Sequence, residues 1–233
     1  MKIKIALITF CFVSISQTCA MQDTPKKRTY DQVATQGLEE IMRFGIAHRK
    51  SELLTLLDNG ANPDTSAGAK SQQTFLHLTV GFDFDLVKSA LLNGGNPNAV
   101  DYCGYSSLHQ AYDAYSYDVD RGQKVIAALL LAGANSEIKN REGHTALAEL
   151  RRCNPEHVPA VQEIASAAPI VKAEREAYNP RVAQLLKVHL PQPITAITMD
   201  FVGPLPIWDD GCWDLFQKHM EQAKKSDQVK RLK

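Results

Sequence analysis

Apolar residues recur three and four positions apart in short segments along the first two thirds of the chain. One segment covers residues 38–44, and another contains the apolar positions Leu86, Val87, Ala90 and Leu91. This spacing places apolar side chains on one face of an α-helix, which can be buried against a neighbouring element. The pattern predicts an all-α chain built from short amphipathic helices.

Small polar residues and glycines mark where these helices begin and end. The predicted N-caps are Ser51 and Thr74, the third unit is predicted to enter its first helix at Ser106, and the fourth repeats that arrangement with Thr145 after its turn. A hydroxyl at this position can accept a hydrogen bond from a backbone N–H of the first turn. Asn59-Gly60 and Gly94-Gly95 are predicted helix stops. A later helix is predicted over 159–167, because proline is tolerated at the first helical position.

Three of these segments end in a similar way, at a nearly constant spacing. They read LDNGANP at 57–63, LNGGNP at 92–97 and LAGAN at 131–135, so that their asparagines Asn62, Asn96 and Asn135 are 34 and 39 residues apart. A second element recurs in phase, as TFLH at 74–77, SSLH at 106–109 and TALA at 145–148. Such a period is typical of stacked repeats, in which each unit buries its apolar face against its neighbours.

Residues 31–168 resemble the ankyrin-repeat family on these motifs. A turn of the form Asp-x-x-Gly-x, then Ser/Thr-x-Leu-His, two short helices and Gly-Ala-Asn is the pattern that the chain shares with the family, although Ala148 replaces the histidine in the fourth unit. The resemblance implies an all-α ankyrin-repeat solenoid of about four helix–turn–helix repeats with short hairpin turns, plus a helical C-terminal cap. It also implies that His77 and His109 fix each hairpin to its helix by hydrogen bonds.

The same resemblance implies a non-catalytic protein–protein interaction module, which binds a partner protein through hairpin tips and inner helices. The tip positions carried over from the family are Tyr102 and Tyr105 in the third unit, and Arg141, Glu142 and His144 in the fourth. We expect these residues to contact the partner.

An insertion of about six residues relative to the family's repeat length adds further tyrosines to the third unit. The surplus lies in 112–122 and contains Tyr112, Tyr115 and Tyr117. Inserted residues in a stacked repeat commonly form a binding loop, and tyrosine is enriched at recognition sites. These three tyrosines are therefore candidate partner-binding residues. In the alternative interpretation the insertion lengthens an inner helix and buries Tyr112 and Tyr115.

The two ends of the chain differ in character from the repeats. Residues 1–20 combine a short basic start, an apolar run and a small-residue ending, which predicts a cleaved signal peptide and export, either periplasmic or secreted, including secretion into a host. Residues 21–30 are predicted to be a flexible lead. Residues 169–233 are predicted to form a helical C-terminal region, with helices over 170–178, 181–189, 194–201 and 214–223 that are separated by proline-containing breaks.

Charge and composition narrow the range of possible functions only a little. Lys plus Arg equals Asp plus Glu at 26 each, so the overall charge does not favour nucleic acid, and no segment after the signal peptide predicts a membrane span. We expect a monomer in solution. An alternative function comes from Leu190-Pro191-x-x-Ile194-x-x-Ile197, which is similar to the start of an F-box helix and implies an adaptor that recruits a ubiquitin ligase.

The sequence contains few residue patterns that are typical of a metal site or an active site. No pair of histidine or cysteine residues has metal-ligand spacing, and no catalytic motif is present, so we expect no metal, no cofactor and no enzymatic activity. Cys212 follows two acidic residues, which would disfavour a thiolate, and is therefore expected to pack in the interior. The competing enzyme hypothesis places an active site around Asp209, Asp210 and Cys212.

Overall fold

The computed structural model describes residues 29–68, 70–189 and 210–231. Its helices are α2 (Gln32–Phe44), α3 (Lys50–Asp58), α4 (Phe75–Thr79), α5 (Phe84–Leu92), α6 (Ser107–Tyr115), α7 (Val119–Leu131), α8 (Ala146–Cys153), a 3₁₀ turn at Pro155–His157, α9 (Val158–His189) and α11 (Asp210–Arg231). Over these ranges the chain is helical and contains isolated β-bridges but no strand, which confirms the all-α prediction.

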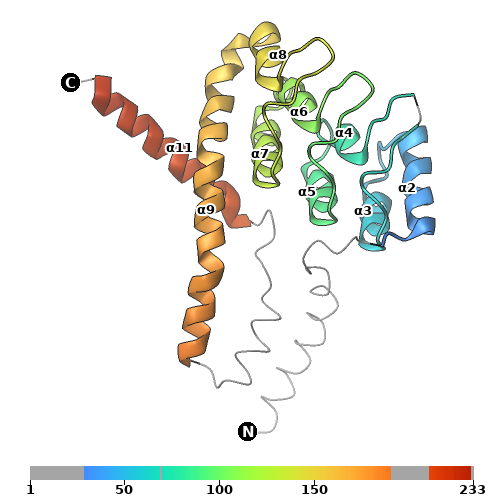
Figure 1. Cartoon of the computed structure of the whole chain (residues 1–233), viewed down its shortest axis with the longest axis horizontal. Coiled ribbons are helices and arrows are strands. Elements are labelled where there is room, and N and C mark those ends of the chain that lie inside the picture. The colour runs from blue at the N-terminus through green and yellow to red at the C-terminus, as the bar shows by residue number, and fades with distance from the viewer. Residues whose placement is uncertain (1–28, 69, 190–209, 232–233) are drawn as a thin grey trace. The chain divides into compact units, whose positions relative to one another are not determined.

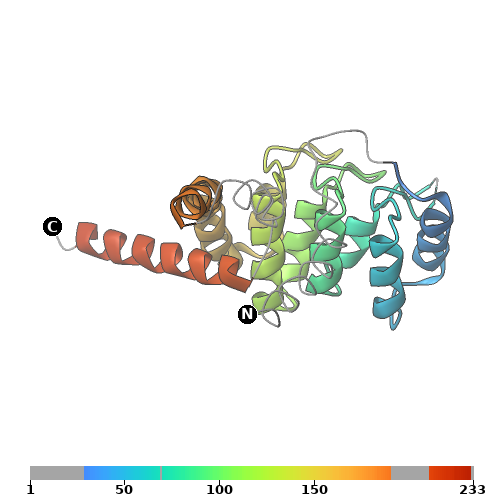
Figure 2. The ribbon, with the colours of Figure 1, turned by 90° about the horizontal axis from the view of Figure 1, so that it is seen from below.

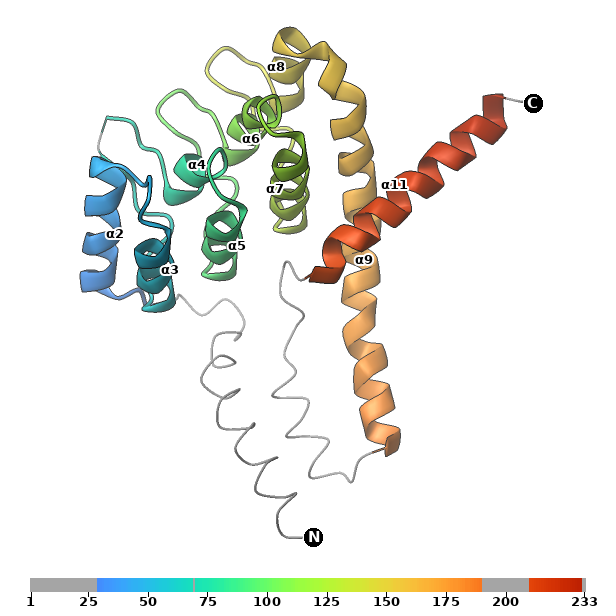
Figure 3. The same cartoon turned by 180° about the vertical axis from the view of Figure 1, so that it is seen from behind.

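The first helices form successive antiparallel pairs. Within each pair α2 contacts α3, α4 contacts α5 and α6 contacts α7, while neighbouring pairs meet through α3, α5 and α7 on one side and through α4, α6 and α8 on the other. Figures 1 and 3 show α3, α5 and α7 side by side, with α4, α6 and α8 as a second row. Figure 2 shows the pairs following one another in chain order, from blue to green.

A β-hairpin-like turn precedes each of α4, α6 and α8, which we call the inner helices. In the third unit Asp101 N–H bonds the Tyr105 carbonyl at 2.9 Å, and in the fourth Asn140 N–H bonds the His144 carbonyl at the same distance. Arg141 N–H also donates to the Cys103 carbonyl at 3.0 Å, which ties one hairpin to the next. Gly104 has φ of +80°, and a Cβ there would lie 3.0 Å from Arg141 N, so this position requires glycine.

The turns that follow α3, α5 and α7, just before each hairpin, are also linked to one another. Asp64 Oδ1 accepts from Asn96 N–H at 2.7 Å, and Asn98 Oδ1 accepts from Asn135 N–H, also at 2.7 Å. Asn98 Nδ2 additionally donates to the Gly133 carbonyl at 3.0 Å. The side chains of Asp64 and Asn98 therefore fix each turn to the following one, through the backbone N–H groups of the recurring Asn96 and Asn135.

Of the two predicted N-caps, Thr74 is confirmed and Ser51 is wrong. Thr74 and Ser106 are the N-caps of α4 and α6, and Thr145 caps α8 by accepting a hydrogen bond from Ala148 N–H. Ser51 lies inside α3, which begins at Lys50 without a side-chain cap. There its carbonyl accepts the hydroxyl proton of Thr55 at 2.8 Å, and Arg49 at the N-cap position pairs instead with Glu52.

The insertion in the third unit lengthens two helices instead of forming a loop. Helices α4 and α5 have 5 and 9 residues, whereas α6 and α7 have 9 and 13. Tyr112 and Tyr115 fall on the inner side of the longer α6 and are only 3% and 2% exposed. The prediction that these two tyrosines contact a partner is therefore wrong, because the extra helical turn directs them into the core.

The C-terminal region contributes to the same hydrophobic core. Val161, Ile164 and Val171 of α9 and Cys212 and Phe216 of α11 are buried in one cluster with the helix pairs. An ion pair adds to this packing, with Lys224 Nζ of α11 lying 3.1 Å from Glu163 Oε2 of α9. The residues from Tyr30 to Lys172 and from Ile207 to Lys233 make up one compact unit.

Two predicted breaks in this region are not observed. Helix α9 begins at Val158 and continues to His189, so the predicted boundary at 168/169 falls inside it, and Asn179-Pro180 does not end it. Proline in a helix interior costs about 3 kcal/mol, and nothing in the structure explains why the helix continues through Pro180. The part of α9 from Ala173 onwards lies outside the compact unit that contains the helix pairs.

Several predictions fall outside the described residues. They concern the signal peptide at 1–20, most of the lead at 21–30, the helix over 194–201 and the F-box-like segment at 190–197. The helix predicted over 214–223 lies within the longer α11. Among the helices that the structure describes, none is both long enough and apolar enough to cross a membrane.

Candidate functional site

Two predicted tip residues lie against each other on adjacent hairpins. Tyr102 is 52% exposed, and the guanidinium carbon of Arg141 lies 4.0 Å from the centre of its ring. The backbone N–H of Tyr102 is fixed by the Ser71 carbonyl at 2.9 Å. A cation–π contact at an exposed site contributes about 0.5–1 kcal/mol, so this pair is a preformed aromatic and cationic surface.

The fourth hairpin carries a hydrogen-bonded charged cluster. His144 Nδ1 lies 3.1 Å from Glu149 Oε1 and 3.8 Å from Glu142 Oε2. Glu149 also accepts from Arg152 at 2.8 Å and from Asn140 Nδ2 at 2.9 Å. Burial opposes ionisation of Glu149, but the hydrogen bonds from Arg152, His144 and Asn140 outweigh it and lower its pKa to about 2.

These side chains include three that could ligate a metal ion. The ligand-type atoms of Glu142, His144 and Glu149 all lie within 4.8 Å of one another. The charge of Glu149 is already compensated by the Arg152 guanidinium, which would weaken the attraction of a cation. We therefore interpret the cluster as a support for the hairpin and assign no metal to it.

Tyr105 lies where the third hairpin meets α6. It is half-buried, and its ring packs edge-to-face against His109 with the ring centres 5.4 Å apart. Its carbonyl oxygen is hydrogen-bonded by His77 Nε2 at 2.9 Å. Tyr105 therefore holds a fixed orientation, with part of its side chain available to solvent.

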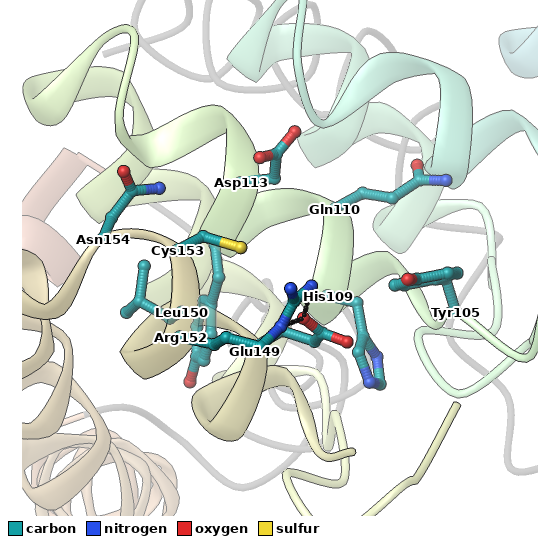
Figure 4. A pocket seen from close by; sticks show the side chains of 10 residues that line it. Tyr105, His109, Gln110, Asp113, Glu149, Leu150, Arg152, Cys153 and Asn154 are labelled. Carbon is teal, nitrogen blue, oxygen red and sulfur yellow. Dashed lines mark hydrogen bonds and ion pairs between the residues drawn. The ribbon is translucent and has the colours of Figure 1, made fainter. Parts of the chain in front are cut away.

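A hollow of about 360 Å³ opens between α6 and α8 beside Tyr105. Figure 4 shows Gln110 and Asp113 on α6, facing Glu149, Arg152 and Cys153 of α8. Tyr112 and Leu150 are also part of the lining, and both are buried. This volume is within the range of sites that hold small ligands or single side chains of a partner.

A second hollow, of about 440 Å³, lies between α4 and α6. Its lining includes Phe82, Tyr117 and Arg121, and it shares Gln110 and Asp113 with the first hollow. The two hollows are therefore neighbours on the inner helices. Gln110 and Asp113 of α6 lie on the border between them.

The predicted tyrosines do not form a single patch. Tyr117 is 83% exposed, but it follows the C-terminal end of α6, whereas Tyr102 and Tyr105 precede the N-terminal end. A helix of this length separates the two ends by about 14 Å. Tyr112 is buried between them, and the burial raises its pKa to about 12.

The two motif histidines have the structural role that the sequence predicts. His77 Nδ1 accepts from Thr74 N–H at 3.2 Å, and His109 Nδ1 accepts from Ser106 N–H at 3.1 Å. The other ring nitrogen of each contacts the next hairpin: His109 Nε2 lies 3.2 Å from the His144 carbonyl oxygen. Each imidazole therefore caps its own helix and joins it to the following unit.

These histidines predict a loss of stability in weak acid. Burial lowers the pKa of both His77 and His109 from the ordinary value of 6.5, so the unfolded chain binds more protons than the folded one below this pH. The free energy of unfolding should be largest above pH 6.5 and decrease as the pH falls through that value. Urea denaturation between pH 7.5 and 5 measures this.

A double His77→Gln/His109→Gln variant is the control for the pH prediction, because glutamine does not titrate. Its unfolding free energy should change less between pH 7.5 and 5 than that of the wild type. If the unfolding free energy of the two proteins changed equally with pH, the pH dependence could not be assigned to these two side chains.

The competing enzyme hypothesis places one active site around Asp209, Asp210 and Cys212. Cys212 is fully buried in the core, as expected for a packing residue, and a thiol in that position is not accessible to a substrate in solution. Asp209 lies outside the described residues.

Comparison with models of known protein families and with curated proteins finds no match to this chain. The assignment of a function therefore depends on the geometry of the hairpins and hollows alone.

Proposed function

We propose that this chain is an exported, non-catalytic ankyrin-like module that binds a partner protein with its hairpin tips and inner helices. The main support is the pair of hollows on α4, α6 and α8, which share Gln110 and Asp113 and together extend over neighbouring units. A repeated scaffold that offers a continuous concave lining is suited to an extended segment of another protein.

The hairpin tips extend this surface. Tyr102 and Arg141 are stacked on each other before any partner arrives, so little side-chain entropy is lost when they are covered. Glu142 and His144 add charged and polar groups beside them. Exposed Tyr117 borders the second hollow, whereas buried Tyr112 and Tyr115 are excluded from the proposed contact set.

Affinity capture with the full chain tests this proposal. A partner identified by mass spectrometry is then titrated against the wild type and a Tyr102→Ala/Tyr117→Ala variant. Both side chains are exposed, so the melting temperature should stay within about 2 °C, whereas the dissociation constant should rise at least about tenfold if either is a recognition hot spot.

Phe44→Ala provides the matched control, because Phe44 is an equally exposed aromatic at the end of α2, outside both hollows. Its affinity for the partner should equal that of the wild type. The proposal is refuted if no partner binds saturably, or if the double variant binds the partner as tightly as the wild type.

A further inference from the structure

Asp113 differs from the other acidic residue that lines the hollows. Asp113 is exposed on α6 and lines both hollows, and no hydrogen bond or ion pair joins its carboxylate to any side chain that the structure describes. Glu149, in contrast, is bonded by Arg152, Asn140 and His144.

The two guanidinium groups that line the hollows are already engaged elsewhere. Arg152 bonds Glu149 at 2.8 Å. Arg121 donates to the Phe82 carbonyl at 2.9 Å and lies 3.7 Å from Asp118. The two hollows therefore contain a single uncompensated charge, and it is negative.

Aromatic side chains border this charge on both sides. Tyr105 lines the first hollow, and Phe82 and Tyr117 line the second. Aromatic faces attract cations, most strongly the planar guanidinium group of arginine. The chain already contains one such contact, between Arg141 and Tyr102.

We propose that Asp113 is the recognition site for a basic side chain, preferentially arginine, of the partner protein. The carboxylate would accept two parallel hydrogen bonds from the guanidinium, and the neighbouring rings would cover its faces. This inference rests on the proposed function, since it specifies which chemistry the partner segment must carry.

A direct test uses N-acetyl-arginine-N′-methylamide as the probe and follows backbone amide signals of the full chain by NMR. The neutral isostere N-acetyl-citrulline-N′-methylamide is the matched ligand. We expect saturable shifts at Gln110, Asp113 and Ala114 with the arginine compound, with a dissociation constant on the order of 1–10 mM, and at least about fivefold weaker binding of the citrulline compound.

Asp113→Asn removes the charge and preserves the shape of the side chain. Because Asp113 is exposed, the variant should melt as the wild type does, but it should bind the arginine compound at least about fivefold more weakly. Asp120→Asn, which removes an exposed carboxylate from α7 outside both hollows, should leave binding unchanged.

The outcomes separate this inference from the function on which it rests. Equal binding of the arginine and citrulline compounds, or undiminished binding by Asp113→Asn, overturns the inference. A captured partner whose affinity does not change in Asp113→Asn also overturns it and leaves the proposed function standing. If the arginine compound binds but no partner protein binds saturably, the proposed function is refuted. Asp113 would then still be a binding site for a cation.

Discussion

Replacing Phe216 with alanine is expected to lower the free energy of unfolding by about 3–5 kcal/mol. The side chain of Phe216 is 0% exposed, lies in the shared hydrophobic cluster and stacks on Trp213 with ring centres 6.3 Å apart. The deletion removes apolar contact area and leaves a cavity that the surrounding helices can fill only in part. Equilibrium denaturation in urea measures the loss.

Gln217→Ala is the matched control, since the neighbouring side chain on α11 is exposed. We expect a change within about 0.5 kcal/mol for this variant. A loss below about 1 kcal/mol in Phe216→Ala would contradict the packing of α11 in the core, and the C-terminal region would then not act as a cap.

His109→Leu is the second substitution with a large expected effect, a loss of about 2–4 kcal/mol in unfolding free energy. Leucine has a similar volume but cannot accept from Ser106 N–H or bond the His144 carbonyl. The buried Ser106 N–H would then lack its partner, which costs about 1–3 kcal/mol. The His144 carbonyl, which also accepts from Asn140 N–H, would lose one of its two hydrogen bonds, and such a bond contributes about 0.5–1.5 kcal/mol. Thermal and urea denaturation report the change.

Ala148→Leu is the matched control for His109→Leu. Ala148 occupies the corresponding position of the fourth unit, where the side chain is exposed and makes no bond to a following hairpin. Its replacement should alter the unfolding free energy by less than about 0.5 kcal/mol. Equal losses in the two variants would show that His109 has no special role between units.

Local sequence signals predicted the helix pairs well because the information is contained within a few residues. The apolar stripe Leu86, Val87, Ala90 and Leu91 is buried as a set in α5. Thr74 and Ser106 cap their helices together with the histidines three positions later. Each of these features depends on helical geometry and a nearby hydrogen bond, which a sequence pattern can reveal.

The insertion could not be resolved from the sequence. Tyr112 and Tyr115 are three residues apart, which suits either an exposed aromatic loop or a longer buried helical face. The structure favours the helix because Gly122 of α7 allows close approach: a Cβ there would lie 2.8 Å from the Cα of Tyr115. That contact joins two helices, so the pattern of α6 alone does not indicate it.

The site was predicted only at the hairpin tips. Tyr102 and Arg141 could be named because the family resemblance places tip residues in the turns, and the structure brings them together. Asp113 and Glu149 were missed, since a single acidic residue on a helix carries no signal by itself. Their importance arises from what lies opposite them on the neighbouring helix.

The hydrogen bonds that join successive units connect positions only 28 to 39 residues apart. If the chain were pulled from its N-terminal end, tension would therefore meet one interface at a time. The helix pairs would unfold one after another, because the unfolding of one pair exposes the interface of the next. A protein that must be threaded through a narrow channel would need only enough force to break a single such junction.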